Sequence, residues 1–154
     1  MSTGLKQPAK QKQLNIAENK FEESATLLKT SPDPYVGLAR LYAYDVNDVE
    51  RAREALKQAE RYGHRQGRKE SALLGDAYRI RADLTWIKSR NLKDSPSQEK
   101  EYLERARQDY IQAQDLYQQS GLYGDSTRNQ MKVIQGQKRI EDRLSQIRGW
   151  SWFR

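Results

Sequence analysis

The amino-acid sequence predicts an all-α protein, an antiparallel stack of about six helices. Three observations support this fold class. Apolar side chains recur at alternating steps of three and four residues, which is the spacing of one face of a helix. No window shows the sustained two-residue alternation that predicts a strand, and breaks rich in Pro and Gly divide the chain into segments of helical length. Short connections between such segments favour antiparallel packing of successive helices.

The composition is poor in apolar residues but does not predict disorder. Hydrophobic residues make up 36% of the 154 residues, less than the roughly 45–50% usual for globular domains. The net charge is only +7, because 28 basic and 21 acidic residues largely cancel. Since disorder requires low hydrophobicity together with high net charge, the periodic pattern favours a fold. The length suits one domain.

The first helices follow from their terminal signals. Residues 1–13 are polar and basic and predict a flexible lead-in to a helical domain over residues 14–149. A first helix begins at Leu14 and ends before Pro32, because proline lacks an amide donor and restricts the residue before it. Asp33 as N-cap and Pro34 at the first helical position then open a second helix, which ends near residue 44.

The later helices show similar signals. Asn47, with Glu50 three residues on, predicts the start of a third helix, and Gly63 predicts its left-handed end. Ser95 followed by Pro96 predicts the start of the fifth. The last three helices are predicted at about 69–89, 96–119 and 125–148.

Two residue patterns repeat among these helices. In three of them Ala is followed after four residues by a bulky apolar residue and after three more by a small one; these sets are Ala17/Phe21/Ser24, Ala52/Leu56/Ala59 and Ala106/Tyr110/Ala113. The helices before the second and third sets carry a related pattern of Tyr35, Leu38, Ala39 and Tyr42, and of Leu74, Gly75 and Tyr78. A small residue lets two helix backbones approach closely while a neighbouring Tyr or Leu fills the space beside it. We interpret both patterns as helix packing.

These patterns resemble the tetratricopeptide repeat (TPR). Its first helix carries an aromatic residue, Leu-Gly or Leu-Ala, and Tyr, and its second carries Ala, a bulky residue and Ala. The likeness covers about residues 14–117; the unit at 32–63 matches best, whereas Ser71 stands where the third unit should have an aromatic residue. The resemblance implies a right-handed α-solenoid of degenerate repeats, closed by the helix at 125–148. The alternative is an irregular helical bundle in which Ala and Tyr recur by chance.

The sequence offers few groups for catalysis. It contains no Cys, and its one His, His64, stands in a polar turn. Neither a P-loop nor a GxGxxG motif is present. The acidic pairs at 22–23 and 141–142 are adjacent in helices, so their side chains diverge by about 100°. We therefore expect no enzyme activity, no metal and no cofactor.

The resemblance implies a binding function instead. TPR domains commonly hold an extended or helical segment in a groove lined by their first helices, which here implies an adaptor or assembly factor for another protein. The family's register gives the candidate groove residues as Arg40, Tyr44, Lys69, Leu73, Asp76, Arg79 and Ile80. Some members bind the terminal carboxylate of a partner with a set of Lys, Asn and Arg side chains. Here only Lys69 stands at such a position, and Leu73 stands where that set has a polar residue, so binding of a terminal carboxylate is disfavoured. The alternative is that all seven are ordinary surface and packing residues.

The distribution of charge leaves nucleic acid as an alternative partner. Residues 63–93 hold eight Lys and Arg against three acids, and residues 126–154 hold seven against two. Positive and negative residues are interleaved on most helices, however, and no nucleic-acid-binding motif accompanies them. We expect a protein partner first.

The C-terminal residues 150–154 concentrate aromatic side chains. Trp150, Trp152 and Phe153 favour a tail that docks on a helix edge, or an anchor for a partner, since such residues dominate binding hot spots.

The sequence contains no signal-peptide core and no apolar run of about 18 residues, so we expect a cytoplasmic protein. A periplasmic location is the alternative if the chain is trimmed from a longer one. The sequence indicates no oligomeric state.

Overall fold

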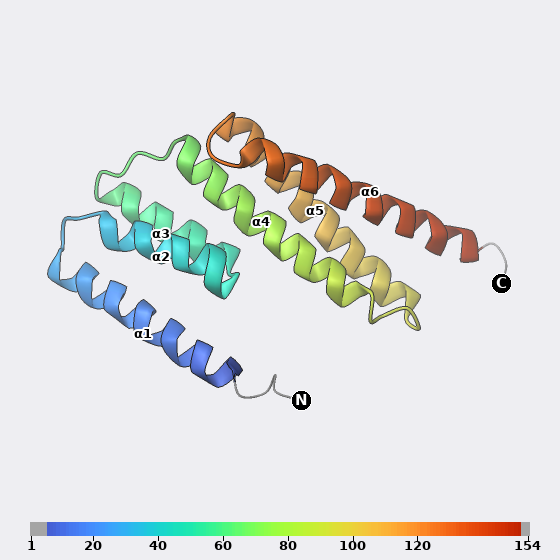
Figure 1. Ribbon diagram of the computed structural model, residues 1–154, viewed down its shortest axis with the longest axis horizontal. Coiled ribbons are helices and arrows are strands. Elements are labelled where there is room, and N and C mark those ends of the chain that lie inside the picture. Colours follow the sequence, from blue (N-terminus) through green and yellow to red (C-terminus); the bar gives the residue numbers. More distant parts are fainter. Residues whose placement is uncertain (1–5, 152–154) are drawn as a thin grey trace. The chain divides into compact units, whose positions relative to one another are not determined.

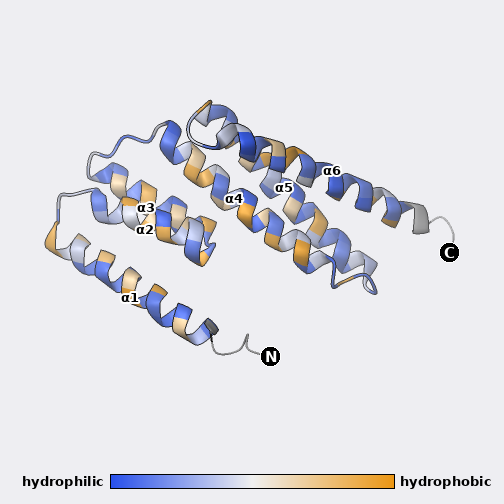
Figure 2. Cartoon of the chain, viewed as in Figure 1, coloured by the Kyte–Doolittle hydropathy of each residue, from blue (hydrophilic) through white to orange (hydrophobic). Residues whose placement is uncertain are grey.

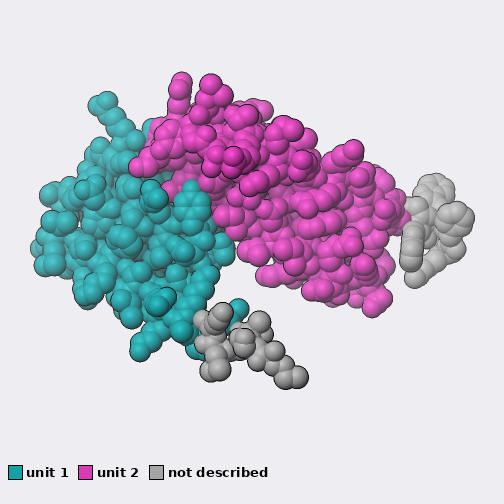
Figure 3. Space-filling view, in the orientation of Figure 1, with its two compact units in different colours: residues 1–66 teal, residues 67–154 magenta. Residues whose placement is uncertain are grey.

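The computed structural model describes residues 6–151, with side chains for residues 7–148, and this part of the chain is helical without any strand (Figure 1). The helices are α1 (Lys6–Leu27), α2 (Asp33–Leu41), a π-helical segment η1 (Tyr42–Val46), α3 (Val49–Arg61), α4 (Arg68–Ser89), α5 (Pro96–Ser120) and α6 (Ser126–Ser151). The all-α prediction is confirmed, and neighbouring helices pack mostly as antiparallel pairs. The chain divides into two compact units, residues 1–66 and residues 67–154 (Figure 3).

Unit 1 contains α1, α2, η1 and α3, with α2 packed against both α1 and α3. Its core consists mainly of small and medium-sized side chains: Leu38, Ala39, Leu41, Tyr42, Ala43, Val49, Ala52, Ala55, Leu56 and Ala59 are buried. The ring of Phe21 lies directly on the backbone of α2, where a Cβ at Gly37 would be 2.2 Å from Cε1 of that ring. The repeat residues Ala17, Phe21 and Tyr35 are half-buried, and Tyr35 stacks on Tyr62 with ring centroids 5.3 Å apart.

A polar contact also joins α1, η1 and α3 of unit 1. The Tyr42 hydroxyl donates to Oε1 of Glu18 on α1 at 2.8 Å. Arg51 of α3 pairs with the same carboxylate, and its guanidinium carbon lies 4.1 Å from the centroid of the Tyr42 ring. Tyr42 therefore contacts Arg51 through its ring and Glu18 through its hydroxyl.

The start of α1 differs from the prediction. The helix begins at Lys6, so it includes residues 6–13, which the sequence assigned to a flexible lead-in. Lys, Gln and Ala all favour helix, and Pro8 lies in the first turn, where no backbone hydrogen bond is lost. This stretch lacks an apolar stripe, which is why periodicity did not reveal it.

The start of α3 also differs, by one residue. Asn47 was predicted as the N-cap, but its φ is 60°, and it ends η1 in the left-handed conformation that Asn tolerates. The N-cap is Asp48, whose carboxylate accepts from the Arg51 amide at 3.0 Å. The predicted left-handed end of α3 is confirmed, since Gly63 has a φ of 89°.

Unit 2 contains α4, α5 and α6, and α5 contacts both of the others. Figure 2 shows apolar residues interspersed with polar ones along each helix. The buried apolar residues are Leu73, Ala77, Tyr78, Ala82, Leu103, Ala106, Tyr110, Ala113, Tyr117, Val133, Ile140 and Leu144. Ser95 is the N-cap of α5 with Pro96 following, as predicted, but its side chain makes no capping hydrogen bond.

The predicted aromatic tail is outside the described side chains. The backbone of α6 continues to Ser151, so position 150 is helical, while Trp152 and Phe153 and the side chain of Trp150 are not described. In the described chain, no helix combines the length and apolar character needed to cross a membrane.

Candidate partner-binding surface

Two tyrosine rings of α5 occupy spaces that only glycine leaves open. A Cβ at Gly75 of α4 would lie 2.8 Å from Cε1 of Tyr117, and a Cβ at Gly136 of α6 would lie 2.4 Å from Cζ of Tyr110. Both tyrosines have no exposed surface. The two glycines therefore let the backbones of α4 and α6 lie directly on these rings.

The two hydroxyls reach carboxylates on α4. Tyr110 donates to Oδ1 of Asp83 at 2.5 Å, and Tyr117 donates to Oδ1 of Asp76 at 2.6 Å. Asp76 and Asp83 are seven positions apart on α4, and Tyr110 and Tyr117 are seven positions apart on α5, which is about two helical turns in each case. Because α4 and α5 run antiparallel, a step of seven along one helix is matched by a step of seven back along the other.

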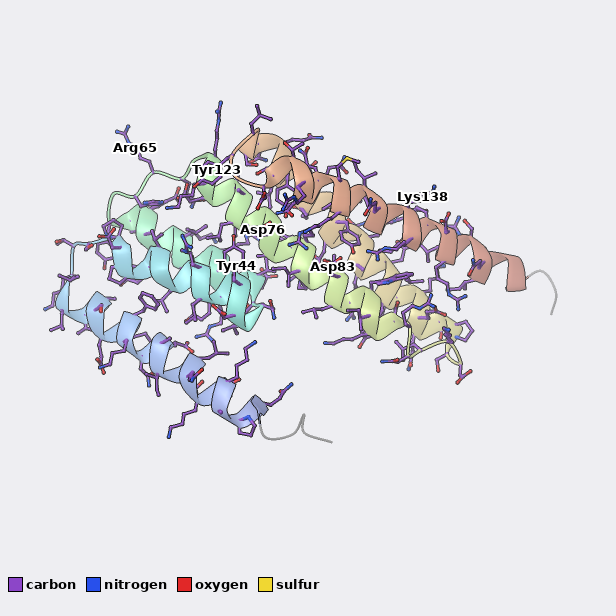
Figure 4. All side chains as sticks on the ribbon, in the orientation of Figure 1. Tyr44, Arg65, Asp76, Asp83, Tyr123 and Lys138 are labelled. Atoms are coloured by element: carbon purple, nitrogen blue, oxygen red, sulfur yellow. The ribbon has the colours of Figure 1, made fainter. Side chains whose placement is uncertain are left out.

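Arg79 and Asn129 complete this arrangement. We call it the Tyr–Asp network, and it consists of Asp76, Arg79, Asp83, Tyr110, Tyr117 and Asn129. Asn129 of α6 donates to Oδ1 of Asp76 at 2.8 Å. Arg79 donates to Oδ2 of Asp83 at 3.0 Å and to the Tyr117 hydroxyl at 3.3 Å. Figure 4 labels Asp76 and Asp83, both on α4. The network therefore links all three helices of unit 2.

The environment of the two tyrosines raises the pKa of both hydroxyls well above the ordinary value. Burial is the main cause for each, followed by the hydrogen bond to a carboxylate and by the negative charge of that carboxylate. A buried hydroxyl that donates to an anion resists deprotonation. Both groups therefore act as donors in the folded protein.

Unfolding should consequently become easier at alkaline pH. Tyrosines ionise near pH ~10 when unfolded, whereas the folded pKa values are raised, so the stability from these groups is present below about pH 10 and is lost as the pH rises further. Urea unfolding measured across this range should show a steeper loss for the wild type than for Tyr117→Phe. Tyr123→Phe, at a tyrosine that is 44% exposed, is the matched control. Equal pH dependence in Tyr117→Phe and the wild type would contradict this account.

Two bidentate ion pairs also join α5 to its neighbours in unit 2. Arg81 of α4 donates to both oxygens of Asp109 at 2.7 Å. Arg143 of α6 donates to Oε1 and Oε2 of Glu99 at 2.6 and 2.8 Å, and the Glu99 side chain is only 1% exposed. These pairs fix the register of α5 against its two neighbours.

The seven candidate groove residues are divided between the two units. Arg40 and Tyr44 are exposed residues of unit 1. In unit 2, Lys69 is exposed in the first turn of α4, and Leu73 is buried as part of the core. The network brings Asp76 and Arg79 together, half-buried, and Ile80 is half-buried one residue further along α4.

Sequence reasoning missed several residues of this surface. Asp83, Asn129 and Arg139 were not singled out, although the matched spacing of Asp76 with Asp83 and of Tyr110 with Tyr117 was a signal for the network. Trp86 was also missed. Its ring has the guanidinium carbons of Arg90 and Arg139 at 5.4 and 5.7 Å from its centroid, within cation–π range.

Among the described residues, no three His, Cys, Asp or Glu side chains gather in a way that could hold a metal ion.

Comparison with known proteins gives no match among protein-family models, curated proteins or solved structures.

Proposed function

We propose that this chain is a non-catalytic protein–protein interaction module, an adaptor or assembly factor that binds a segment of another protein on TPR-like helices. The observation that carries the proposal is that the side chains of Asp76 and Arg79 are fixed by hydrogen bonds. Both are half-buried residues of α4 held in place by hydrogen bonds with side chains of α5 or α6: Arg79 donates to Tyr117, and Asp76 accepts from Tyr117 and Asn129. They are also two of the residues that the repeat register assigns to partner binding.

A fixed polar pattern on rigid helices favours binding. Side chains that are already ordered lose little conformational entropy when a partner docks, so preorganisation improves affinity. Leu84 and Ile87, further along α4, are 41% and 59% exposed. They offer apolar area next to the polar pattern, the combination found at many interfaces.

The solenoid remains part of this proposal. The α2–α3 and α4–α5 pairs would be successive repeats, and α6 would be the closing helix that packs on α5. Gly75 against Tyr117 and Gly37 against Phe21 are close helix contacts of the kind expected from a small residue beside an aromatic one.

The chemistry of the network supports binding better than catalysis. Its hydroxyls donate to carboxylates and have raised pKa values, so neither tyrosine is poised to act as a base near neutral pH. Asp83 uses both oxygens on side chains of the same unit. These groups are arranged to hold helices and to present a fixed surface.

Nucleic acid is the second candidate, and basic residues of α6 favour it. Lys132 and Arg139 are exposed, and Arg139 lies near Trp86, which gives a cation beside an aromatic ring. Asp83, however, places a carboxylate that is 37% exposed beside Arg139. A phosphate backbone would be repelled there, so we prefer a protein partner.

The test is capture of a partner from the source cells at physiological ionic strength, followed by reconstitution of the purified pair. We expect an identified protein that stays bound after nuclease treatment and forms a complex with the purified chain by calorimetry. Recovery of nucleic acid alone would contradict the proposal. A steep loss of that binding with added salt would then identify phosphate contacts.

A further inference from the structure

One side of α6 carries a row of cations beside α4. Asn129 and Arg139 establish which side this is, because Asn129 donates to Asp76 and Arg139 lies 3.9 Å from Oδ1 of Asp83. Lys132 is three residues after Asn129 and seven before Arg139, so it lies on the same side of the helix. Both Lys132 and Arg139 are exposed.

The facing part of α4 carries an aromatic ring, a cation and an apolar side chain. Trp86 is half-buried, with Arg90 above its ring, and Ile87 is 59% exposed. Arg139 reaches the same ring from α6, with its side chain 52% exposed. We call these five residues, Trp86, Ile87, Arg90, Lys132 and Arg139, the α4–α6 face.

Two acids of α4 near this face, Asp76 and Asp83, are engaged inside unit 2. Asp83 accepts from Tyr110 with one oxygen and from Arg79 with the other. Asp76 accepts from Tyr117 and Asn129. The face carries the positive charges of Arg90, Lys132 and Arg139, and the carboxylate beside Arg139, that of Asp83, also binds Arg79. The face is therefore complementary to an anionic ligand.

We propose that the α4–α6 face binds an acidic amphipathic segment of a partner protein. Carboxylates of the segment would pair with Arg90, Lys132 and Arg139, and its apolar side chains would pack on Trp86 and Ile87. Arginine and tryptophan are the residues most often found at interface hot spots. This inference rests on the proposed function and adds the chemistry of the partner and the place where it binds.

Two features favour a protein segment over a nucleic acid. The Asp83 side chain is 37% exposed, and its carboxylate lies 3.9 Å from Arg139, where it repels phosphate. Ile87, and Leu84 one turn before it, expose aliphatic surface. Aliphatic surface suits Leu or Phe of an amphipathic segment better than the charged backbone of a nucleic acid.

The experiment uses the full chain and a fluorescein-labelled peptide with Glu on one face of its helix and Leu and Phe on the other. Fluorescence anisotropy at physiological ionic strength should show saturable binding. The double variant Lys132→Gln/Arg139→Gln should bind about tenfold more weakly, because two charge pairs are lost. Ile87→Ser should also weaken binding, and a peptide with Gln in place of Glu should bind poorly.

The matched control is Lys100→Gln/Lys138→Gln, which removes the same charge from exposed positions outside the face and should keep wild-type affinity. Circular dichroism checks that all variants fold. Equal weakening by both double variants, or no binding of the acidic peptide to the wild type, would overturn the inference. So would a single-stranded oligonucleotide that binds more tightly than the peptide with the same dependence on Lys132 and Arg139.

Failure of this inference can be told apart from failure of the proposed function. If a captured partner protein binds Lys132→Gln/Arg139→Gln as tightly as the wild type, the inference is wrong and the proposed function stands. If no protein partner is captured at all, the proposed function itself fails.

Discussion

Replacing Arg143 by Met should lower the free energy of unfolding by about 3 kcal/mol. The substitution leaves the Glu99 carboxylate, with its side chain 1% exposed, without the two hydrogen bonds that Arg143 donates. Removing one partner of a buried ion pair costs about 3–5 kcal/mol. We expect the lower end of that range, because Glu99 lies in the first turn of α5, where the helix dipole favours an anion.

Urea unfolding followed by circular dichroism measures this loss. The second substitution Glu99→Gln in the Arg143→Met background should restore part of the stability, because it removes the buried charge. Arg128→Met is the control, since its pair with Asp125 is exposed on both sides. A loss below about 1 kcal/mol for Arg143→Met would mean that the pair behaves like one on the surface.

Gly136→Val should destabilise the protein by about 3 kcal/mol through overpacking. Its Cβ would lie 2.4 Å from Cζ and 2.6 Å from the hydroxyl oxygen of Tyr110. That ring cannot move aside easily, because it is fully buried and its hydroxyl is bound to Asp83. Valine has a higher helix propensity than glycine, so the loss would come from packing and not from the helix.

Gln135→Val, at the adjacent exposed position of α6, is the matched control and should change stability little. The same thermal and urea unfolding measurements serve both variants. Equal stability of Gly136→Val and the wild type would show that α6 does not lie against Tyr110 in the way described here.

The helices were predictable because their signals are local. Apolar periodicity and the breaks at Pro32, Gly63 and Pro96 each depend on neighbouring residues, and they gave the helices in their observed order. Two boundaries failed for physical reasons. The start of α1 has helix propensity without an apolar stripe, and Asn and Asp compete as caps at the start of α3.

The surface of unit 2 was less predictable because it depends on contacts between helices. Asp76 and Arg79 were proposed from the repeat register, but their partners come from α5 and α6, more than thirty residues away. Leu73 shows the opposite case, since the register proposed it for partner binding and it is buried. Single-residue patterns cannot distinguish a polar residue that faces a partner from one that holds the fold, and the hydrogen bonds of Asp76 and Arg79 show that both hold the fold.

Photo-crosslinking tests the central claim, that α4 and α6 present a surface for a partner protein, most directly. p-Benzoylphenylalanine would be placed at position 87 of α4, or as a control at position 111 of α5, where Ile is 37% exposed and follows the inward-facing Tyr110 by one residue. We predict that irradiation in the source cells crosslinks position 87, and not position 111, to one discrete protein. Equal crosslinking from both positions, or crosslinks from position 87 to nucleic acid alone, would contradict the claim.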